Sequence, residues 1–225
     1  MSTATISPNG TFTPQARKLG IIAAWMTFGL FEIYAVVSGI TYASQGKAVE
    51  NGPSLAIMSL LVVLMGPFLI LSMISVHAYA PVEKKQYSLA SLIFMTACIT
   101  ITTCTNFMLL IVSSMPDLFS ASWQAMFLPC IWPAPAFVLD NFTWDWFFGI
   151  SMLLAFPVFR GSTLKNAIRF VMITSGILCI AGLIWIAISP AQAVIIGILG
   201  WGVAGPFVFL LLANLFTRIQ AGDIN

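Results

Sequence analysis

Six long apolar segments occupy most of this chain and constrain its fold more than any other feature. They run approximately over residues 20–43, 54–76, 88–113, 142–159, 166–189 and 191–216. Each is close to the length of about 20 residues that an α-helix needs to cross a bilayer. With 60% hydrophobic and only 7% charged residues, a soluble domain of this size would leave far more apolar surface in water than soluble proteins do. The sequence therefore predicts an all-α, polytopic transmembrane helical bundle of six spans.

The basic residues predict the orientation of these spans. If the N-terminus is inside, eight of the nine Lys and Arg residues lie on the cytoplasmic side, and only Lys47 lies outside. The eight are Arg17, Lys18, Lys84, Lys85, Arg160, Lys165, Arg169 and Arg218. This segregation follows the positive-inside rule. We therefore expect both termini in the cytoplasm and the protein in the cytoplasmic (inner) cell membrane. Residues 1–19 would form a cytoplasmic segment, residues 20–218 the transmembrane domain and residues 219–225 a cytoplasmic tail.

The connection between the third and fourth expected spans, residues 114–141, differs from the short connections elsewhere. It is apolar and rich in Trp, and it contains Pro129, Pro133 and Pro135. Because proline lacks a backbone N–H and clashes with the preceding turn, a continuous helix is disfavoured here. We expect an extracytoplasmic interfacial loop that lies on the outer leaflet or dips into it.

The first expected span contains an acidic residue, Glu32. It follows Gly20 by twelve residues, which places it about 18 Å along the helix, near the middle of a hydrocarbon core about 30 Å thick. A carboxylate at that depth costs a few kcal/mol, so we expect its side chain to face protein or water. Gly29, Ala35 and Gly39 on nearby turns would let another helix approach closely. Two interpretations stay open: a proton or cation site, and a structural hydrogen bond between helices.

A polar stripe follows one face of the third expected span. Thr96, Thr100, Thr103 and Asn106 recur at i, i+4, i+7 and i+10, which aligns them along a helix. Thr100 is expected at the depth of Glu32. A single threonine in a membrane helix commonly bonds its own backbone, but the full stripe predicts a polar cavity or a helix interface.

Asp145 stands between Trp144 and Trp146 at the expected outer end of the fourth span. Tryptophan is typical of the membrane interface, and an acid near a helix N-terminus is stabilised by the helix dipole. A capping role and a binding role both stay open.

The last span carries a stripe of small residues that predicts a packing face: Ala193, Gly197, Gly200 and Ala204.

Several chemistries are excluded by residues that the sequence lacks. His77 is the only histidine, so one chain cannot build a bis-His haem or a multi-His metal site. The four cysteines form no C-x-x-C pair, and no phosphate-binding loop motif is present. We expect no catalytic residues, no metal, no cofactor and no nucleic-acid partner. A lipid enzyme using Asp117, Asp140 or Asp145 stays open as a third class, although it lacks a nucleophile–base pair.

Three stretches resemble a group of uncharacterised bacterial multi-pass membrane proteins of the DUF4386-like kind. They are "VHAYAPVEKKQYSLASLIFM" (76–95), "WDWFFGISMLLAFPVFRG" (144–161) and "GWGVAGPFVFLLL" (200–212). The resemblance extends over about residues 20–218. It implies a bacterial cytoplasmic-membrane protein, and it implies no activity, substrate or site residue.

These observations predict an integral membrane protein that binds or translocates a small molecule or ion within a six-helix bundle. The candidate binding or proton-site residues are Glu32, Thr100, Thr103, Asn106 and Asp145. The alternative is a non-catalytic accessory or assembly subunit of a membrane complex. The expected partners are the lipid bilayer, a small-molecule or ion substrate, and other membrane subunits or a second copy of the chain.

Overall fold

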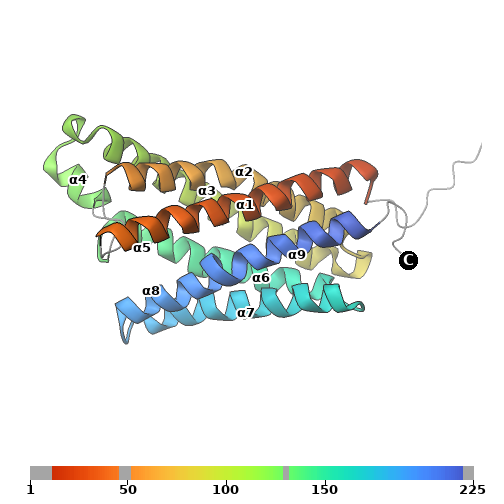
Figure 1. The fold of residues 1–225 in the computed structure, drawn as a ribbon. Coiled ribbons are helices and arrows are strands. Elements are labelled where there is room, and N and C mark those ends of the chain that lie inside the picture. The colour runs from red at the N-terminus through yellow and green to blue at the C-terminus, as the bar shows by residue number, and fades with distance from the viewer. Residues whose placement is uncertain (1–11, 46–51, 129–131, 220–225) are drawn as a thin grey trace, which may run out of the picture.

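Five long helical segments run side by side in a bundle (Figure 1). The structure is a computed structural model that describes residues 12–45, 52–128 and 132–219. Within these residues, five segments are long and apolar enough to cross a membrane. They are α1 (Pro14–Gln45), α2 (Pro53–Tyr79), η1 with α3 (Val82–Lys84 and Lys85–Ser114), α7 (Thr163–Trp185), and the run Pro190–Arg218. The predicted all-α, multi-pass membrane architecture is thereby confirmed.

The fourth expected span, residues 142–159, corresponds to a run of shorter helical pieces. The run consists of α5 (Pro135–Phe142), the π-helix η3 (Thr143–Phe148), α6 (Gly149–Ala155) and the 3₁₀-helix η4 (Phe156–Val158). It therefore begins at Pro135 rather than at residue 142. This position suits proline, whose missing N–H is not needed in the first turn of a helix. The run is not among the five long apolar segments.

Short helices occupy part of the expected interfacial loop at 114–141. The 3₁₀-helix η2 (Pro116–Leu118) and α4 (Ala121–Phe127) precede α5. The predicted break in the helix is therefore present between α4 and α5, but the last part of the loop belongs to the helical run that starts at Pro135. Residues 1–11, Lys47, Pro129 and residues 220–225, on which other predictions depend, lie outside the described part of the chain.

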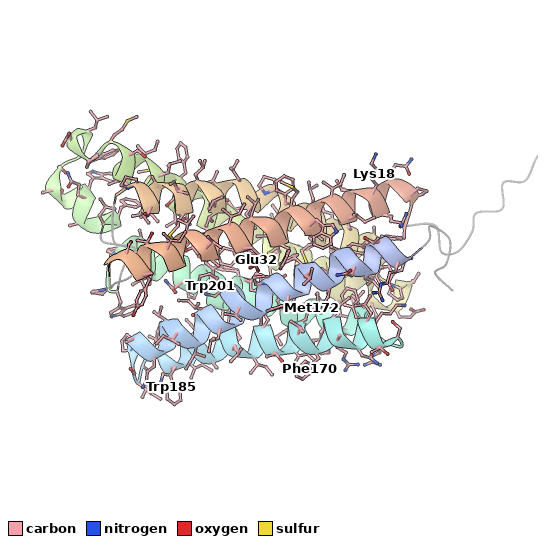
Figure 2. All side chains as sticks on the ribbon, in the orientation of Figure 1. Lys18, Glu32, Phe170, Met172, Trp185 and Trp201 are labelled. Carbon is pink, nitrogen blue, oxygen red and sulfur yellow. The ribbon has the colours of Figure 1, made fainter. Side chains whose placement is uncertain are left out.

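The start of α1 and the end of α9 (Gly205–Arg218) meet at one end of the bundle. Arg17 donates from Nε to the backbone oxygen of Phe216 at 2.8 Å and from Nη2 to that of Thr217 at 2.7 Å. At the same end, the Lys165 ammonium lies 5.6 Å from the centre of the Tyr79 ring. Lys18, labelled in Figure 2, and Arg218, the last residue of α9, lie at the same end of the bundle.

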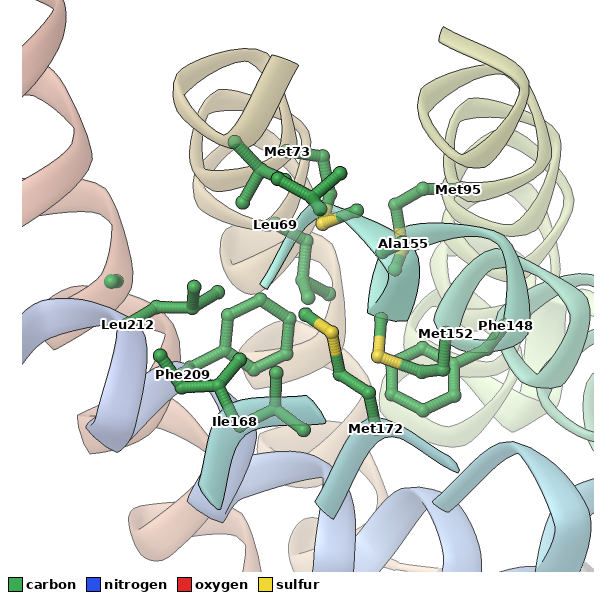
Figure 3. Close-up of a cluster of buried hydrophobic side chains, with 14 of the residues drawn as sticks. Leu69, Met73, Met95, Phe148, Met152, Ala155, Ile168, Met172, Phe209 and Leu212 are labelled. Carbon is green, nitrogen blue, oxygen red and sulfur yellow. The ribbon is translucent and has the colours of Figure 1, made fainter. Parts of the chain in front are cut away.

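The core is built mainly from methionine, leucine and phenylalanine side chains of α2, α3, η3, α6, α7 and α9 (Figure 3). It comprises Leu69, Met73, Met95, Phe148, Met152, Ala155, Ile168, Met172, Phe209 and Leu212. Large apolar side chains also cover much of the exterior, for example Ile40, Phe170 and Ile184, each at least 65% exposed. An apolar exterior of this extent suits a lipid environment and not water.

A second π-helix, η5 (Leu199–Ala204), joins α8 (Pro190–Ile198) to α9. Pro206 follows it and has no N–H to continue the helical hydrogen bonds. The Ser175 hydroxyl of α7 donates to the carbonyl of Gly200 at 2.8 Å, which satisfies one backbone group in the irregular segment. A Cβ at Gly200 would collide with Cys179. The small-residue stripe of the last span is therefore a packing face, as predicted.

Candidate functional site

The main polar cluster in the bundle is centred on Asp140 of α5. Thr102 of α3 donates its hydroxyl to Asp140 Oδ1, and Asn106 donates from Nδ2 to the same oxygen at 3.0 Å. Asn106 also donates to the backbone oxygen of Thr102 at 3.0 Å, so the two α3 side chains are held in place together. Thr102 and Asn106 are buried and Asp140 is half-buried. The indole of Trp144, one turn along from Asp140, is within hydrogen-bonding reach of it.

A small cavity of about 10 Å³ adjoins this cluster. Its lining combines polar and aromatic side chains: Phe31, Tyr34, Val62, Met65, Asp140, Trp144 and Trp201. The Nε1 atom of Trp201 is buried and has no hydrogen-bond partner. We refer to these lining residues as the Asp140 cavity. Its volume is enough for about one water molecule, and it offers both a donor and an acceptor to that water.

Aromatic rings fix the walls of the Asp140 cavity. Trp144 of η3 stacks on Trp201 of η5 with ring centroids 5.4 Å apart and an interplanar angle of 29°. Phe31 of α1 packs edge-on against Trp144 with a centroid separation of 6.0 Å. The two tryptophans therefore join the two π-helices beside the cavity. Single π-helical turns inside α-helices are frequent at functional sites.

Asp145 lies in the interior of the bundle and not at a helix end. It is 2% exposed, and its Oδ1 atom has no hydrogen-bond partner. A Cβ added to Gly197 of α8 would collide with the Asp145 carboxylate, so glycine is what allows the acid to lie against α8. Because the helical run starts at Pro135, the capping role considered for Asp145 is wrong. Its binding role stays a prediction.

Glu32 lies near the middle of α1 (Figure 2), but its side chain is exposed on the exterior of the single chain. The inward orientation expected for Glu32 is therefore not observed. The neighbouring Gly29 and Gly39 have open space at their Cβ positions, with no heavy atom within 4 Å. The same small residues that suggested an inward face are thus not in contact with other helices of this chain.

The polar stripe of α3 divides between two environments. Thr96 and Thr100 are exposed, and each donates to the backbone oxygen four residues earlier at 2.8 Å. Thr103 is half-buried, and its Oγ1 atom has no hydrogen-bond partner. Only Asn106 of the stripe belongs to the Asp140 cluster. The exposed Glu32 and Thr100, expected at one depth, therefore do not line a common cavity with Thr103 and Asn106.

The sequence patterns did not identify Asp140 and Thr102 as members of a binding site. Asp140 precedes the expected fourth span and was considered only as a surface acid of a lipid enzyme. Thr102 lies off the chosen stripe, but Thr102 and Asn106 have the i, i+4 spacing of helical neighbours. That pairing of a threonine with an asparagine in an apolar helix is the signal that identifies them.

The three aspartates considered for an enzyme do not form one surface cluster. Asp117 is exposed in η2, whereas Asp145 is buried and Asp140 is half-buried beside its cavity. Among residues 12–45, 52–128 and 132–219, no group of three or more His, Cys, Asp or Glu side chains could hold a metal ion. The geometry therefore favours a polar site within the bundle over a metal centre or a catalytic acid pair.

Comparison of the chain with protein-family models, curated proteins and solved structures finds no match. What the protein does must accordingly be inferred from its own residues. By helix length, apolar composition and apolar exterior it is an integral multi-pass membrane protein. The resemblance to uncharacterised bacterial membrane proteins stays a prediction.

Proposed function

We propose that the chain crosses the cytoplasmic membrane six times with both termini inside, and that it binds and transfers a proton at Asp140. The crossing number is supported by the helical run from Pro135 to Val158, which is roughly as long as the hydrocarbon core is thick. It is also supported by the contact of Arg17 with Phe216, since an even number of crossings returns the chain to its starting side. The basic residues at that end favour a cytoplasmic location for it.

The observation that carries the proposed activity is that Asp140 and Trp201, whose buried indole N–H is unpartnered, line the same cavity of about 10 Å³. A water molecule in this cavity accepts a hydrogen bond from the Trp201 indole and donates one to Asp140. Ionisable residues inside membrane bundles commonly belong to proton or ion pathways. Asp140 is then the group that takes up and releases the proton.

The size and chemistry of the Asp140 cavity favour a proton over a larger solute. A cavity for about one water molecule excludes an organic substrate in this conformation. A second cavity, about 260 Å³ in volume, lies between α3, α4 and α5. It is lined mainly by apolar groups such as Met108, Phe127 and Leu139, so it offers little to a charged ligand.

Proton flux into liposomes tests the proposal. The purified full-length protein is reconstituted with a pH-sensitive dye inside, and a potassium diffusion potential drives proton entry. Asp140→Asn removes the titratable group but keeps an acceptor for Thr102 and Asn106. It should reduce flux at least tenfold, whereas Thr100→Val, on the exposed side of α3, should leave flux unchanged. Equal flux from wild type, Asp140→Asn and empty liposomes would contradict the proposal.

A second function, that of an accessory or assembly subunit, is favoured by the exposed Glu32 on α1. An acid on the lipid-facing side of a helix calls for a polar group from outside the chain. Purification in a mild detergent separates the two functions. A different protein retained at a fixed ratio in wild type and lost with Glu32→Leu supports the accessory function.

A further inference from the structure

We infer that Asp145 of η3 is a second proton-binding residue of the bundle, and that it is protonated in the state in which Asp140 is ionised. Its role in proton transfer rests on the proposed function, whereas its protonation can be measured without any flux. The inference stands on the burial of the Asp145 carboxyl group, on an oxygen without a hydrogen-bond partner, and on the charges of the surrounding elements.

The Asp145 carboxyl group is enclosed in the bundle and lies directly against α8. The residue is 2% exposed, and its Oδ1 atom has no hydrogen-bond partner. A Cβ added to Gly197 would collide with both carboxyl oxygens, so no hydrating water fits between the acid and α8. A carboxylate buried without donors is far more costly than a neutral carboxyl group. These surroundings therefore favour the protonated acid.

None of the elements around Asp145 brings a positive charge to it in the described part of the chain. α5, α6, α8 and η5 contain no Lys or Arg. The last basic residue of α7, Arg169, precedes Gly182 by thirteen positions. Because Gly182 packs against Gly197, this base is about 20 Å along α7 from the level of Asp145. The one base of α3 is its first residue, Lys85, so these elements hold no cation that would balance an ionised Asp145.

The titratable side chains that face η3 from its neighbours are two thiols and one acid. The Cys98 thiol of α3 is within hydrogen-bonding reach of the Phe148 backbone. Cys179 of α7 lies near Asp145, and Asp140 precedes η3 on α5. Both thiols are buried. Because neither a thiol nor a second acid supplies a positive charge, these groups do not stabilise a carboxylate.

Asp140 has the opposite surroundings. Thr102 and Asn106 both donate hydrogen bonds to its Oδ1 atom, and donors of this kind stabilise the ionised form of a carboxyl group. One helical run thus carries one acid with donors and one acid without them. Where the surroundings of two acids separate their proton affinities in this way, they identify a proton donor and a proton acceptor. Asp145 is then the donor and Asp140 the acceptor.

The two acids lie at neighbouring levels of the bundle. They are five positions apart, which corresponds to about 7.5 Å along a helix axis. Asp145 contacts Gly197, and the Asp140 cavity is lined by Trp201, four positions further along the same run. Transfer of the proton breaks the O–H bond of Asp145 and forms one on Asp140. The negative charge moves the opposite way, and no other reactant is needed.

The pH dependence of reversible unfolding of the full-length protein in detergent micelles measures the protonation of Asp145. An unfolded aspartate ionises near pH 4, so a fold that keeps the proton on Asp145 loses stability as the pH rises above that value. The unfolding equilibrium constant of wild type relative to Asp145→Asn should therefore rise up to tenfold per pH unit between about pH 4 and pH 7. The ratio of wild type to Thr100→Val, which removes no titratable group, should not change with pH.

Proton flux into liposomes measures the role of Asp145 in transfer. Asp145→Asn and the smaller Asp145→Ala should each reduce flux at least tenfold, whereas Thr100→Val should conduct as wild type. Alanine removes the contact with Gly197 together with the acid. A loss in both variants therefore cannot come from a collision of the new amide with α8.

A ratio between wild type and Asp145→Asn that stays constant with pH would overturn the inference, because folding would then leave the protonation of Asp145 unchanged. Flux at the wild-type level in both Asp145 variants would overturn it as well. A wild-type protein without flux contradicts instead the function proposed for Asp140. In that case the pH dependence of unfolding still decides whether Asp145 holds a proton.

Discussion

Asn106 of α3 donates a hydrogen bond to Asp140 of α5 at 3.0 Å and so joins two helices that are separated by the interfacial region of the chain. Thr102 donates to the same carboxyl oxygen. An acid in an apolar bundle is tolerated only when it is paired, hydrogen-bonded or neutral. The two α3 side chains therefore hold Asp140 at the edge of its cavity.

Replacing Asn106 with Leu should destabilise the bundle. The substitution keeps a similar volume but leaves the half-buried Asp140 with one donor fewer, which costs about 1–3 kcal/mol. The free energy of unfolding in detergent micelles measures the effect. Thr100→Val is the control: its hydroxyl bonds only its own helix, so a change within about 0.5 kcal/mol is expected. Equal losses in the two variants would argue against a special role for the Asn106–Asp140 contact.

Gly197→Ala should also destabilise the protein, because the added Cβ would collide with the Asp145 carboxylate. We expect a loss of about 1–3 kcal/mol, as for other overpacked sites. Gly29→Ala adds the same methyl group where nothing lies within 4 Å and should be neutral or slightly stabilising. Thermal unfolding of both variants in the same detergent compares them. A Gly197→Ala variant that unfolds at the same temperature as wild type would mean that Asp145 does not pack against α8 as described.

Arg17→Met should loosen the end of α9. The Arg17 guanidinium donates to the carbonyls of Phe216 and Thr217, which are among the last four of the helix and have no partner within it. Loss of these bonds should speed amide hydrogen exchange in the last turn of α9 several-fold. Lys18→Met removes a charge from the neighbouring position and should leave that exchange rate close to wild type. Similar exchange in both variants would count against the bridge between α1 and α9.

The proposed topology predicts which residues a membrane-impermeant thiol reagent reaches. Leu118, 75% exposed in η2, lies on the expected outer side, and Glu83, in η1 among the basic residues, lies on the expected inner side. In a chain without Cys104 and Cys130, Leu118→Cys should react in intact cells. Glu83→Cys should react only after permeabilisation. The reverse pattern would invert the orientation, and reaction of both in intact cells would place them on the same side and require an even number of crossings between them.

Much of the fold could be predicted from the sequence because hydrocarbon requires long, apolar, internally bonded helices. Five of the six expected segments are long apolar helical segments in the structure. The start of the remaining one was wrong because three prolines and a Trp-rich composition indicated an interface, whereas Pro135 begins a helix that carries Asp140 inward. Hydropathy cannot foresee that Thr102 and Asn106, from a helix far away in sequence, satisfy that acid.

The orientation of Glu32 shows a second limit of sequence patterns. Small residues on a helix face indicate close packing, but the pattern is the same whether the neighbouring helix belongs to the same chain or to another. The sequence therefore predicted a packing face and assigned it to the interior, where the structure leaves it exposed. Only the arrangement of α2 and α9 around α1 distinguishes the two cases.

Infrared difference spectroscopy of the reconstituted protein tests the central claim, that Asp140 binds and releases a proton, most directly. Spectra recorded between acidic and alkaline pH should contain the carbonyl stretching band of a protonated carboxyl group. That band should disappear in Asp140→Asn and persist in Thr100→Val. A band that is unchanged in Asp140→Asn, or that disappears only in variants of Asp145 or Glu32, would contradict the assignment of the proton site to Asp140.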